Sequence, residues 1–279
     1  MSILRQGFGV FVTRVWAAAA GLIMSIIIAR SFGPEGKGIA SLMLLVPVLL
    51  STFGNAGLHI SNVYFFGKKG ASISRLASNS VWVALVLGLL VCGVGIAFYP
   101  LVGDRFFAGV PGPFLFTIVA LTPAMLLSAY FGNLLLAQRR IAVFNTVMAV
   151  QTGVQLATLM IAIYFFDAGV IAVVLGLVVN IIIGALGMTA LVYRADPFTW
   201  TFDRPLFKQT MLYGLKGYVA NALQFLNYRS DILLVSFFLG ATAVGWYSVA
   251  VNFAEILWYV PTSLGTILFP VVASSSIAN

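Results

Sequence analysis

The chain has 279 residues, of which 61% are hydrophobic and only 8% are charged, and its formal net charge is +8 at pH 7. About 25% of the residues of a soluble domain are charged, so a soluble protein with a charged surface is excluded. The single cysteine, Cys92, excludes a disulfide scaffold, and one cysteine with one histidine does not complete a structural zinc site. The composition therefore predicts an integral membrane protein that crosses the bilayer several times.

Long intervals without charge predict an all-α fold, because a helix needs about 20 mostly apolar residues to cross the hydrocarbon core. Three of the expected helices carry charge: Arg14 lies in the first, Lys216, Arg229 and Asp231 lie in the seventh, and Glu255 lies in the eighth. The segments are too long and too uniformly apolar for the strands of a membrane β-barrel. We expect eight transmembrane helices, at 8–30, 39–66, 79–100, 113–137, 142–166, 168–193, 213–239 and 246–270.

The distribution of lysine and arginine predicts the orientation of these helices. If the N-terminus is inside, ten of the 15 basic residues fall on the inner side, three fall outside and two lie within helices. This bias places both termini in the cytoplasm and the basic residues beside anionic membrane lipids. The basic residues are spread over several connections rather than one face, so no nucleic-acid partner is expected.

The longest polar connection divides the chain. We expect an N-terminal six-helix lobe over 1–193, a cytoplasmic connection over 194–215, and the first two helices of a second lobe over 216–279. No connection is long enough to hold a soluble catalytic domain, and the sequence has no glycine-rich phosphate loop or nucleophile elbow. We therefore do not expect an enzyme.

An internal repeat relates the first two helices to the last two. Three residues recur at one offset of 207 positions: Gly33 with Gly240, Gly38 with Gly245, and Ser41 with Ser248. The first and seventh helices both run from inside to outside, so the repeat is parallel, and it predicts two six-helix lobes related by an axis along the membrane normal. Because only two helices of the second lobe are present, we expect a fragment or a truncated gene product; the alternative is a complete eight-helix protein.

Two stretches carry a resemblance to a known family. The first is Ala-Arg-Ser-Phe-Gly-Pro-Glu-Gly-Lys-Gly at 29–38, and the second is Leu-Asn-Tyr-Arg-Ser-Asp at 226–231, which continues through 244–250 to Glu255 and Pro261. They resemble the turns and helices of bacterial polysaccharide and lipid-linked oligosaccharide flippases, within the multidrug/oligosaccharidyl-lipid/polysaccharide exporter superfamily. The resemblance implies 12 to 14 helices in two lobes around a central cavity, with no ATPase domain, in the bacterial cytoplasmic membrane.

Polar residues at helical spacing indicate where such a cavity lies. Arg229 lies 11 residues before Gly240 and Glu255 lies 10 residues after Gly245, so the two side chains reach similar depth in an antiparallel hairpin. Stripes at spacings of three and four place further polar groups on single helix faces. The ten cavity candidates are Arg14, Asn55, His59, Asn221, Gln224, Asn227, Arg229, Asp231, Asn252 and Glu255.

Each of these candidates also has a structural alternative. Arg229 either forms a buried pair that fixes the hairpin, with Glu255 or through Asp231, or contacts a substrate phosphate. Arg14 either snorkels to the interface or steers a pyrophosphate. The stripes either line a hydrated cavity or form interhelical hydrogen bonds. His59 is a candidate for proton coupling. No cofactor and no bound metal are expected, and the coupling ion, Na⁺ or H⁺, stays open.

The leading functional hypothesis is a flippase that moves polyprenyl-pyrophosphate-linked oligosaccharide across the membrane by alternating access. Its possible partners are a polysaccharide polymerase or glycosyltransferases. The first alternative is a cation-coupled multidrug exporter of the same superfamily, which requires acidic cavity residues. Another is a membrane-embedded glycosyltransferase, which requires a hydrophilic catalytic loop that the sequence lacks. The last is a non-transporting membrane partner or a remnant.

Overall fold

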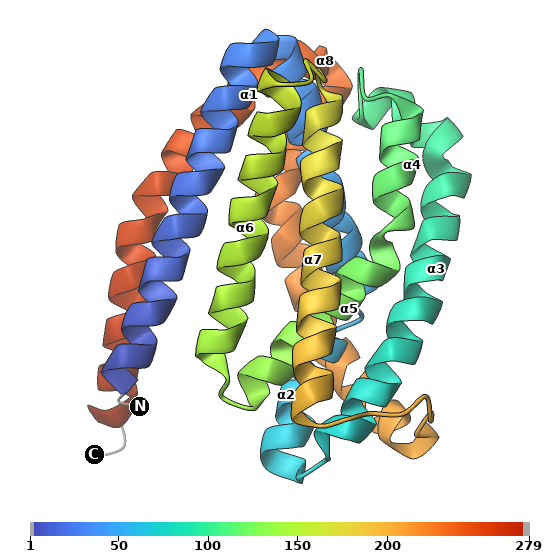
Figure 1. Ribbon diagram of the computed structural model, residues 1–279, viewed down its shortest axis with the longest axis vertical. Helices are drawn as coiled ribbons and strands as arrows, with labels where there is room; N and C mark the ends of the chain where they lie inside the picture. The colour runs from blue at the N-terminus through green and yellow to red at the C-terminus, as the bar shows by residue number, and fades with distance from the viewer. Residues whose placement is uncertain (1–2, 276–279) are drawn as a thin grey trace.

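The structure is a computed structural model that describes the backbone of residues 3–275 and the side chains of residues 9, 11–103 and 105–255. The described backbone forms helices and connecting turns, with no strand (Figure 1). Pro261, part of the second motif, lies outside the described side chains. The helices are α1 (Ile3–Gly54), α2 (Leu58–Lys69), α3 (Ile73–Phe106), α4 (Gly112–Ala120), α5 (Thr122–Ala137), α6 (Ile141–Tyr164), α7 (Ile171–Ala195) and α8 (Arg204–Ser275).

The longest helices, α1 and α8, are hairpins whose arms run in opposite directions (Figure 1). The first hairpin, α1, bends at Gly33, where φ is 66° and ψ is −171°; the second hairpin, α8, bends at Gly240, where φ is 80° and ψ is −178°. Only glycine adopts this region of backbone space without strain. One residue therefore makes each turn, and the two equivalent glycines of the repeat have nearly the same conformation.

The expected helix boundaries are wrong at several places. The helix expected at 79–100 is longer at both ends, as Ile73–Phe106, and Ser72 caps its first turn. The helix expected at 39–66 breaks after Gly54, because Gly57 is left-handed at φ 73° and Asn55 Oδ1 accepts a hydrogen bond from its backbone N–H at 2.8 Å. The helix expected at 113–137 breaks at Leu121, just before Pro123, which cannot continue a helical hydrogen-bond ladder. The seventh helix, expected at 213–239, begins at Arg204, because Asp203 caps it.

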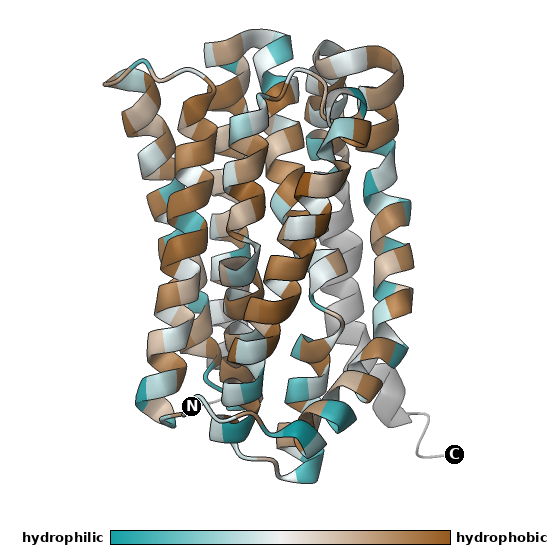
Figure 2. Ribbon diagram, turned by 90° about the vertical axis from the view of Figure 1, so that its right-hand side faces the viewer, coloured by the Kyte–Doolittle hydropathy of each residue, from teal (hydrophilic) through white to brown (hydrophobic). Residues whose placement is uncertain are grey.

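The described residues contain six helical segments that are long and apolar enough to cross a membrane. Two of the six are the hairpins, each with two arms, so the eight expected spans all have a counterpart. Large apolar side chains are exposed on the bundle, such as Leu101, which is 70% exposed, and Leu186, which is 67% exposed. Figure 2 shows that hydrophobic residues predominate along the length of the helices. The chain is therefore an all-α membrane protein.

The two ends of the bundle differ in charge. The glycine end, where both hairpins turn, holds Arg30, Lys37 and Arg105. The opposite end, called the basic end below, is where α2 and the α7–α8 connection lie and where hydrophilic residues gather (Figures 1 and 2). Its basic residues are Lys68, Lys69, Arg75, Arg139, Arg140, Arg194, Arg204, Lys208 and Lys216.

Buried apolar side chains form two clusters. One joins both hairpins to α4, α6 and α7 and includes Met43, Ile118, Val174 and Val244. The other joins α2, α3, α5 and the start of α8 and includes Leu58, Phe131 and Leu206. Because the second hairpin contributes to both clusters, it packs against the preceding helices along its length.

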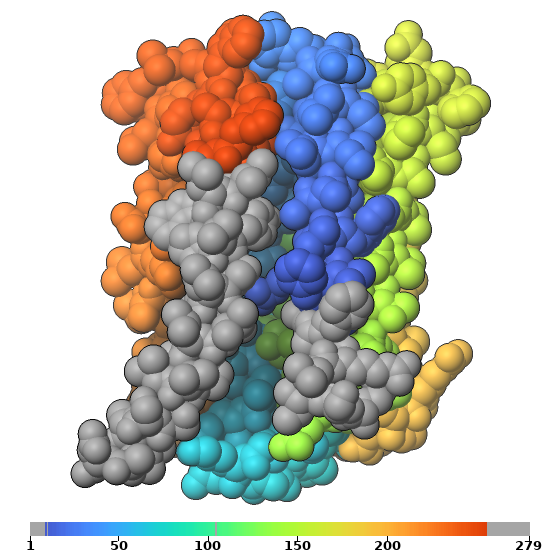
Figure 3. All heavy atoms as spheres, turned by 90° about the vertical axis from the view of Figure 1, so that its left-hand side faces the viewer, coloured from blue at the N-terminus to red at the C-terminus, as the bar shows by residue number. Residues whose placement is uncertain are grey.

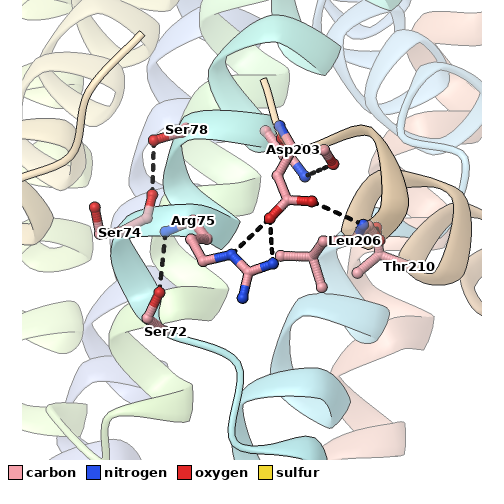
Figure 4. A network of polar contacts seen from close by, with 8 residues as sticks. Ser72, Ser74, Arg75, Ser78, Asp203, Leu206 and Thr210 are labelled. Atoms are coloured by element: carbon pink, nitrogen blue, oxygen red, sulfur yellow. Dashed lines mark hydrogen bonds and ion pairs between the residues drawn. The ribbon is translucent and has the colours of Figure 1, made fainter. Parts of the chain in front are cut away.

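The connection between α7 and α8 is fixed to the first turns of α3 (Figure 4). Asp203 and Asn79 exchange two hydrogen bonds, Asp203 N to Asn79 Oδ1 at 2.8 Å and Asn79 Nδ2 to Asp203 O at 3.0 Å. Arg75 forms an ion pair with the Asp203 carboxylate and donates from Nε at 2.6 Å. Nearer α7, Asp196 accepts a hydrogen bond from Ser74 N at 3.1 Å. We call this set of contacts the α3 clamp.

Asp203 has a second task within the clamp, because its Oδ1 accepts a hydrogen bond from Leu206 N at 3.0 Å and caps α8. The pKa of its carboxyl is lowered, chiefly by this backbone N–H and further by the hydrogen bond and charge of Arg75, while partial burial opposes the shift. The ion pair with Arg75 and the cap of α8 therefore depend on an ionised Asp203.

Candidate functional site: the interface between the two hairpins

The two hairpins lie side by side on one face of the molecule (Figure 3) and touch through their backbones at the glycine end. A Cβ atom on Gly38 would overlap the carbonyl oxygen of Ala241, and a Cβ atom on Gly245 would overlap that of Pro34. Gly38 and Gly245 are equivalent residues of the repeat, and Pro34 and Ala241 are separated by the same 207 positions. Each contact is thus the counterpart of the other, which only glycine at both positions allows.

The third matched pair lies in the same contact. Ser41 Oγ donates a hydrogen bond to Ser248 Oγ at 3.0 Å, so equivalent residues of the two hairpins meet each other. When equivalent residues of two related units contact each other, a local two-fold axis passes between them. The repeat at the turns is confirmed, and its axis runs along the bundle, as a parallel repeat requires. The division into six-helix lobes stays a prediction.

Arg229 and Glu255 form the ion pair that their spacing predicts, with 3.1 Å between Arg229 Nη1 and Glu255 Oε1. At 1.5 Å per residue, Arg229 lies about 16 Å from Gly240 along the helix, near the middle of a 30 Å hydrocarbon core. The side chains are 34% and 48% exposed, so the pair is not buried. It joins the two arms of the second hairpin and leaves part of the guanidinium accessible.

Asp231 does not pair with Arg229, as expected for residues two positions apart on a helix. Its Oδ2 accepts a hydrogen bond from Tyr247 Oη at 2.5 Å, which is a second link between the arms of α8. Asn252 adds a further contact between the two hairpins, because its Nδ2 donates a hydrogen bond to Ser25 Oγ on the first arm of α1 at 3.0 Å. Four predicted polar residues of α8, Arg229, Asp231, Asn252 and Glu255, thus have partners at mid-depth.

The remaining candidates do not gather at one point. Asn55 caps the break after α1, with its Nδ2 donating to Ser51 O at 2.6 Å. His59, on α2, is half-buried, and its Nδ1 has no hydrogen-bond partner. The other four candidates are exposed, one on the first arm of α1 and three on the first arm of α8: Arg14, Asn221, Gln224 and Asn227. Their shared cavity stays a prediction.

Two of the polar stripes join neighbouring helices by hydrogen bonds rather than line a cavity: the stripe that includes Asn62, and the stripe that includes Gln151 and Gln155. Asn62 Nδ2 donates to Ser80 Oγ at 2.8 Å and joins α2 to α3. Gln151 Nε2 donates to Asn180 O at 3.0 Å, and Asn180 Nδ2 donates to Gln155 Oε1 at 2.9 Å, which together join α6 to α7. These residues bind helices together in the apolar bundle.

Near the basic end, the interface is formed by α2 and the first arm of α8. A Cβ atom on Gly57 would overlap the backbone of Gly214, so the two elements cross closely there. Tyr218 Oη donates to Phe53 O at 2.7 Å, and Tyr64 stacks on Tyr213 with ring centroids 4.2 Å apart. Beside this stack lies a pocket of about 310 Å³ that includes Lys69 and Lys216 among its lining residues.

A larger groove of about 660 Å³ lies between the first arm of α1 and α6. It is lined mainly by apolar atoms, and Trp16 closes one side by donating from Nε1 to Ala149 O at 3.2 Å. None of the ten candidates lines this groove or the pocket near Lys69. Among the described residues, no three His, Cys, Asp or Glu side chains are grouped so as to hold a metal ion.

Sequence reasoning missed several contacts of the site. It paired Ser41 with Ser248 as equivalents, yet equivalence alone does not reveal that they touch. It counted Lys37 among the three basic residues outside the membrane, and gave no sign that this residue is buried, with only 3% exposed. The α3 clamp is not predictable from the sequence, because Arg75 and Asp203 are far apart in the chain. Only the helix cap at Asp203 is indicated, since aspartate is a common residue at the start of a helix.

Comparison with known proteins identifies the family. The sequence matches the family described as polysaccharide biosynthesis protein over residues 3–276. It is 25% identical over 235 residues to the succinoglycan biosynthesis transport protein ExoT of Rhizobium meliloti (strain 1021). That match covers 82% of this chain and 45% of the relative, so the chain spans about half the length of the curated relative it matches.

Two solved structures share the fold, each with a TM-score of 0.67 at 17% sequence identity. One is a MOP superfamily transporter from Pyrococcus furiosus Vc1 (DSM3638), described as having a binding pocket of reverse polarity. The match covers 91% of this chain and 59% of the transporter. The other is an outward-facing multidrug resistance MATE family transporter of the MOP superfamily, with coverage of 91% and 60%. The family match over nearly the whole sequence shows that the chain belongs to the polysaccharide biosynthesis protein family.

Proposed function

We propose that these helices form the first part of a transporter that moves lipid-linked oligosaccharide across the bacterial cytoplasmic membrane by alternating access. The carrier lipid is a polyprenyl pyrophosphate, whose apolar tail stays in the bilayer while the sugar head crosses between the hairpins. The basic end faces the cytoplasm in this proposal, in keeping with its excess of lysine and arginine. A polysaccharide polymerase or glycosyltransferases are the partners that such a substrate implies.

The observation that carries the proposal is the paired hairpin interface. Equivalent residues of the hairpins touch at the glycine end through Gly38, Gly245 and the Ser41–Ser248 hydrogen bond. Helix pairs related by an internal repeat are typical of transporters in which two halves rock around a central site. In this proposal the glycine end parts when the protein opens outward.

Arg229 is the residue best suited to contact the substrate. A guanidinium binds phosphate oxygens in a bidentate fashion, and Glu255 holds this one at mid-depth with part of its surface accessible. An arriving pyrophosphate replaces the Glu255 carboxylate as the partner of Arg229. Exchange of one anion for another keeps the guanidinium paired, and the displaced Glu255 carboxylate, whose side chain is 48% exposed, is hydrated by the water of the open transport path.

The second candidate function is a cation-coupled exporter, and Asp231 and Glu255 are the observation that favours it. Both carboxylates lie on the second hairpin at mid-depth, and one accepts a hydrogen bond from Tyr247. An exporter of cations would use these carboxylates to bind its substrate. Replacement of Glu255 by Gln would abolish such export, whereas it would leave Arg229 free for a phosphate.

The test is lipid transport by the full-length protein in proteoliposomes that contain a fluorescent polyprenyl-pyrophosphate oligosaccharide. We expect Arg229→Gln to slow transfer between leaflets by about tenfold or more, the effect of one lost charge-assisted hydrogen bond. Arg229→Lys keeps the charge without the fork and should be intermediate. Arg105→Gln, an exposed arginine at the glycine end, is the matched control. Unchanged transfer by Arg229→Gln would refute the role of Arg229, and no transfer by the wild-type protein would refute the flippase.

A further inference from the structure

The pocket near the basic end is built from two separate elements. From α2 it is lined by Tyr64, Phe65 and Lys69, and from the first arm of α8 by Gln209, Leu212, Tyr213 and Lys216. The four residues of α8 are spaced by three, one and three positions, so they share one helix face. Its volume of about 310 Å³ is at the lower end of the range for small-ligand sites.

Aromatic contacts hold the two elements in register beside the pocket. The Tyr64 and Tyr213 rings stack with an interplanar angle of 11°, and Phe65, only 7% exposed, meets Tyr213 edge-on at 6.0 Å. The close backbone contact of Gly57 with Gly214 fixes the crossing of the same two elements. The pocket is therefore preformed, and a ligand need not order it.

The charges of the pocket have one sign and no internal partner. Lys69 and Lys216 are both exposed, and no acidic residue lines the pocket. The ion pairs found among the described side chains are Arg75 with Asp203 and Arg229 with Glu255, so neither lysine is neutralised there. Gln209 adds an amide that donates hydrogen bonds. Two ammonium groups and an amide around one small concave site are suited to a doubly charged or polyvalent oxyanion.

The position of the pocket restricts which oxyanion it meets. It lies at the end of the bundle where hydrophilic residues gather (Figure 2), and its two tyrosines are accessible, Tyr64 in part and Tyr213 at 39% exposure. Tyrosine and lysine are enriched at the level of lipid headgroups, where an aromatic ring contacts acyl chains and a charged group meets phosphate. A ligand there is presented by the membrane rather than by bulk solution.

We propose that this pocket binds the phosphate of a membrane lipid headgroup, with Lys69, Lys216 and Gln209 as donors to its oxygens. The same chemistry is offered by an anionic phospholipid of the bilayer and by the pyrophosphate of a polyprenyl carrier. The phospholipid source is independent of the proposed transport, whereas the polyprenyl source rests on it. In either case the bound phosphate bridges α2 to the second hairpin and stabilises their contact.

Native mass spectrometry of the full-length protein tests this proposal. The protein is titrated separately with phosphatidylglycerol, with phosphatidylcholine and with undecaprenyl pyrophosphate, and the dissociation constant of each bound lipid is measured. The pocket variant is Lys69→Gln with Lys216→Gln. The matched control is Lys68→Gln with Lys208→Gln, which removes two exposed charges from the same helices outside the pocket.

We expect the pocket variant to bind an anionic lipid at least about tenfold more weakly than the control, the effect of losing one charge-assisted hydrogen bond or more. Loss confined to phosphatidylglycerol identifies the bilayer as the source, and loss confined to undecaprenyl pyrophosphate identifies the carrier. Lys69→Arg with Lys216→Arg should bind as the wild type does, which guards against a folding defect. Equal affinities in the pocket variant and its control would overturn the proposal.

The lipid titration also separates this proposal from the flippase. Binding of phosphatidylglycerol is measured without any transfer between leaflets, so a protein that moves no oligosaccharide still reports on the pocket. Conversely, loss of binding in the pocket variant with normal transfer of oligosaccharide supports a phospholipid site and leaves the flippase intact.

Discussion

The two ends of the hairpin interface are built in different ways. At the glycine end, backbone meets backbone, and the contact of Gly38 with Ala241 has its counterpart in that of Gly245 with Pro34. At the basic end, α2 meets α8 through stacked aromatic side chains, and nothing in that contact obeys the 207-residue repeat. The glycine end is symmetric and consists of backbone contacts with one serine pair, while the basic end is asymmetric and combines the backbone contact of Gly57 with Gly214 with stacked aromatic side chains.

The lysine side chains of the basic end can adapt to a ligand, whereas the backbone contact of the glycine end cannot. A close backbone contact has no rotamers to adjust, so it is either fully made or broken, as a two-state element requires. Long side chains such as Lys69 and Lys216 change rotamer at little cost and accommodate a ligand. We therefore expect substitutions at the glycine end to act by steric exclusion, and substitutions at the basic end to act through charge and hydrogen bonding.

The largest expected effect comes from locking the glycine end. Ser41→Cys with Ser248→Cys, in a Cys92→Ala background, places two thiols where the hydroxyls are 3.0 Å apart, within reach of a disulfide. Oxidation should reduce oligosaccharide transfer to the background of empty liposomes, and a reductant should restore it. Lipid binding at the basic end should be unchanged, because that contact is not altered.

Each single cysteine variant is the control for this cross-link, since it cannot form the intramolecular bond. If the oxidised double variant transfers oligosaccharide at the wild-type rate, the glycine end does not part during transport. The proposal that the glycine end opens while the basic end adapts to its ligand would then be refuted.

The next largest effect comes from adding one methyl group at the same contact. Gly38→Ala or Gly245→Ala forces a Cβ atom into a carbonyl oxygen of the other hairpin. Overpacking of this kind costs about 1–3 kcal/mol. We expect a lower thermal midpoint for the full-length protein in detergent, with the two alanine variants destabilised equally because their contacts are equivalent.

Gly21→Ala is the matched control for this steric effect. Gly21 lies on the first arm of the same hairpin, and a Cβ atom there would have no neighbour within 4 Å. Alanine is favoured over glycine in a helix interior by about 0.5–1 kcal/mol, so this variant should be as stable as the wild type or more so. Unequal effects of Gly38→Ala and Gly245→Ala would show that the contact is not symmetric.

The sequence predicts the glycine end well and the basic end poorly, for a physical reason. A tight turn and a close backbone approach both demand glycine, so Gly33, Gly38 and their counterparts stand out in the sequence. The depth of Arg229 and Glu255 also follows from the helical rise once the turn is known, and their ion pair at 3.1 Å confirms it.

Contacts between distant side chains leave no comparable trace. Tyr64 and Tyr213 obey no spacing rule, and Lys69 and Lys216 look like ordinary residues of cytoplasmic connections until α2 and α8 are seen to cross. The break after Gly54 was missed because apolar periodicity continues through it, although Asn55 and Gly57 are typical turn residues. The spacing of residue types along the chain reflects local structure, such as turns and helix faces, and does not reveal which distant residues come into contact.

The smallest expected effect concerns the α3 clamp at the basic end, where side-chain chemistry decides stability. Asp203→Ala removes both the cap of α8 and the partner of Arg75, and loss of such a cap costs about 1 kcal/mol. Asp203→Asn keeps a good cap but removes the charge, so it should cost less than about 1 kcal/mol, as expected for an exposed ion pair. Hydrogen exchange in the first turn of α8 measures both.

The pH dependence of the same turn separates the cap from the charge. Because the pKa of Asp203 is lowered in the folded protein, the contribution of its carboxylate is complete above the unfolded value of about 3.9 and is lost as the pH falls through the folded value. Exchange in the first turn of the wild type should therefore accelerate below about pH 4 relative to Asp203→Asn, whose cap does not titrate. Parallel acceleration in both proteins would assign the acid sensitivity to another group and remove Asp203 as the residue that anchors α8 to α3.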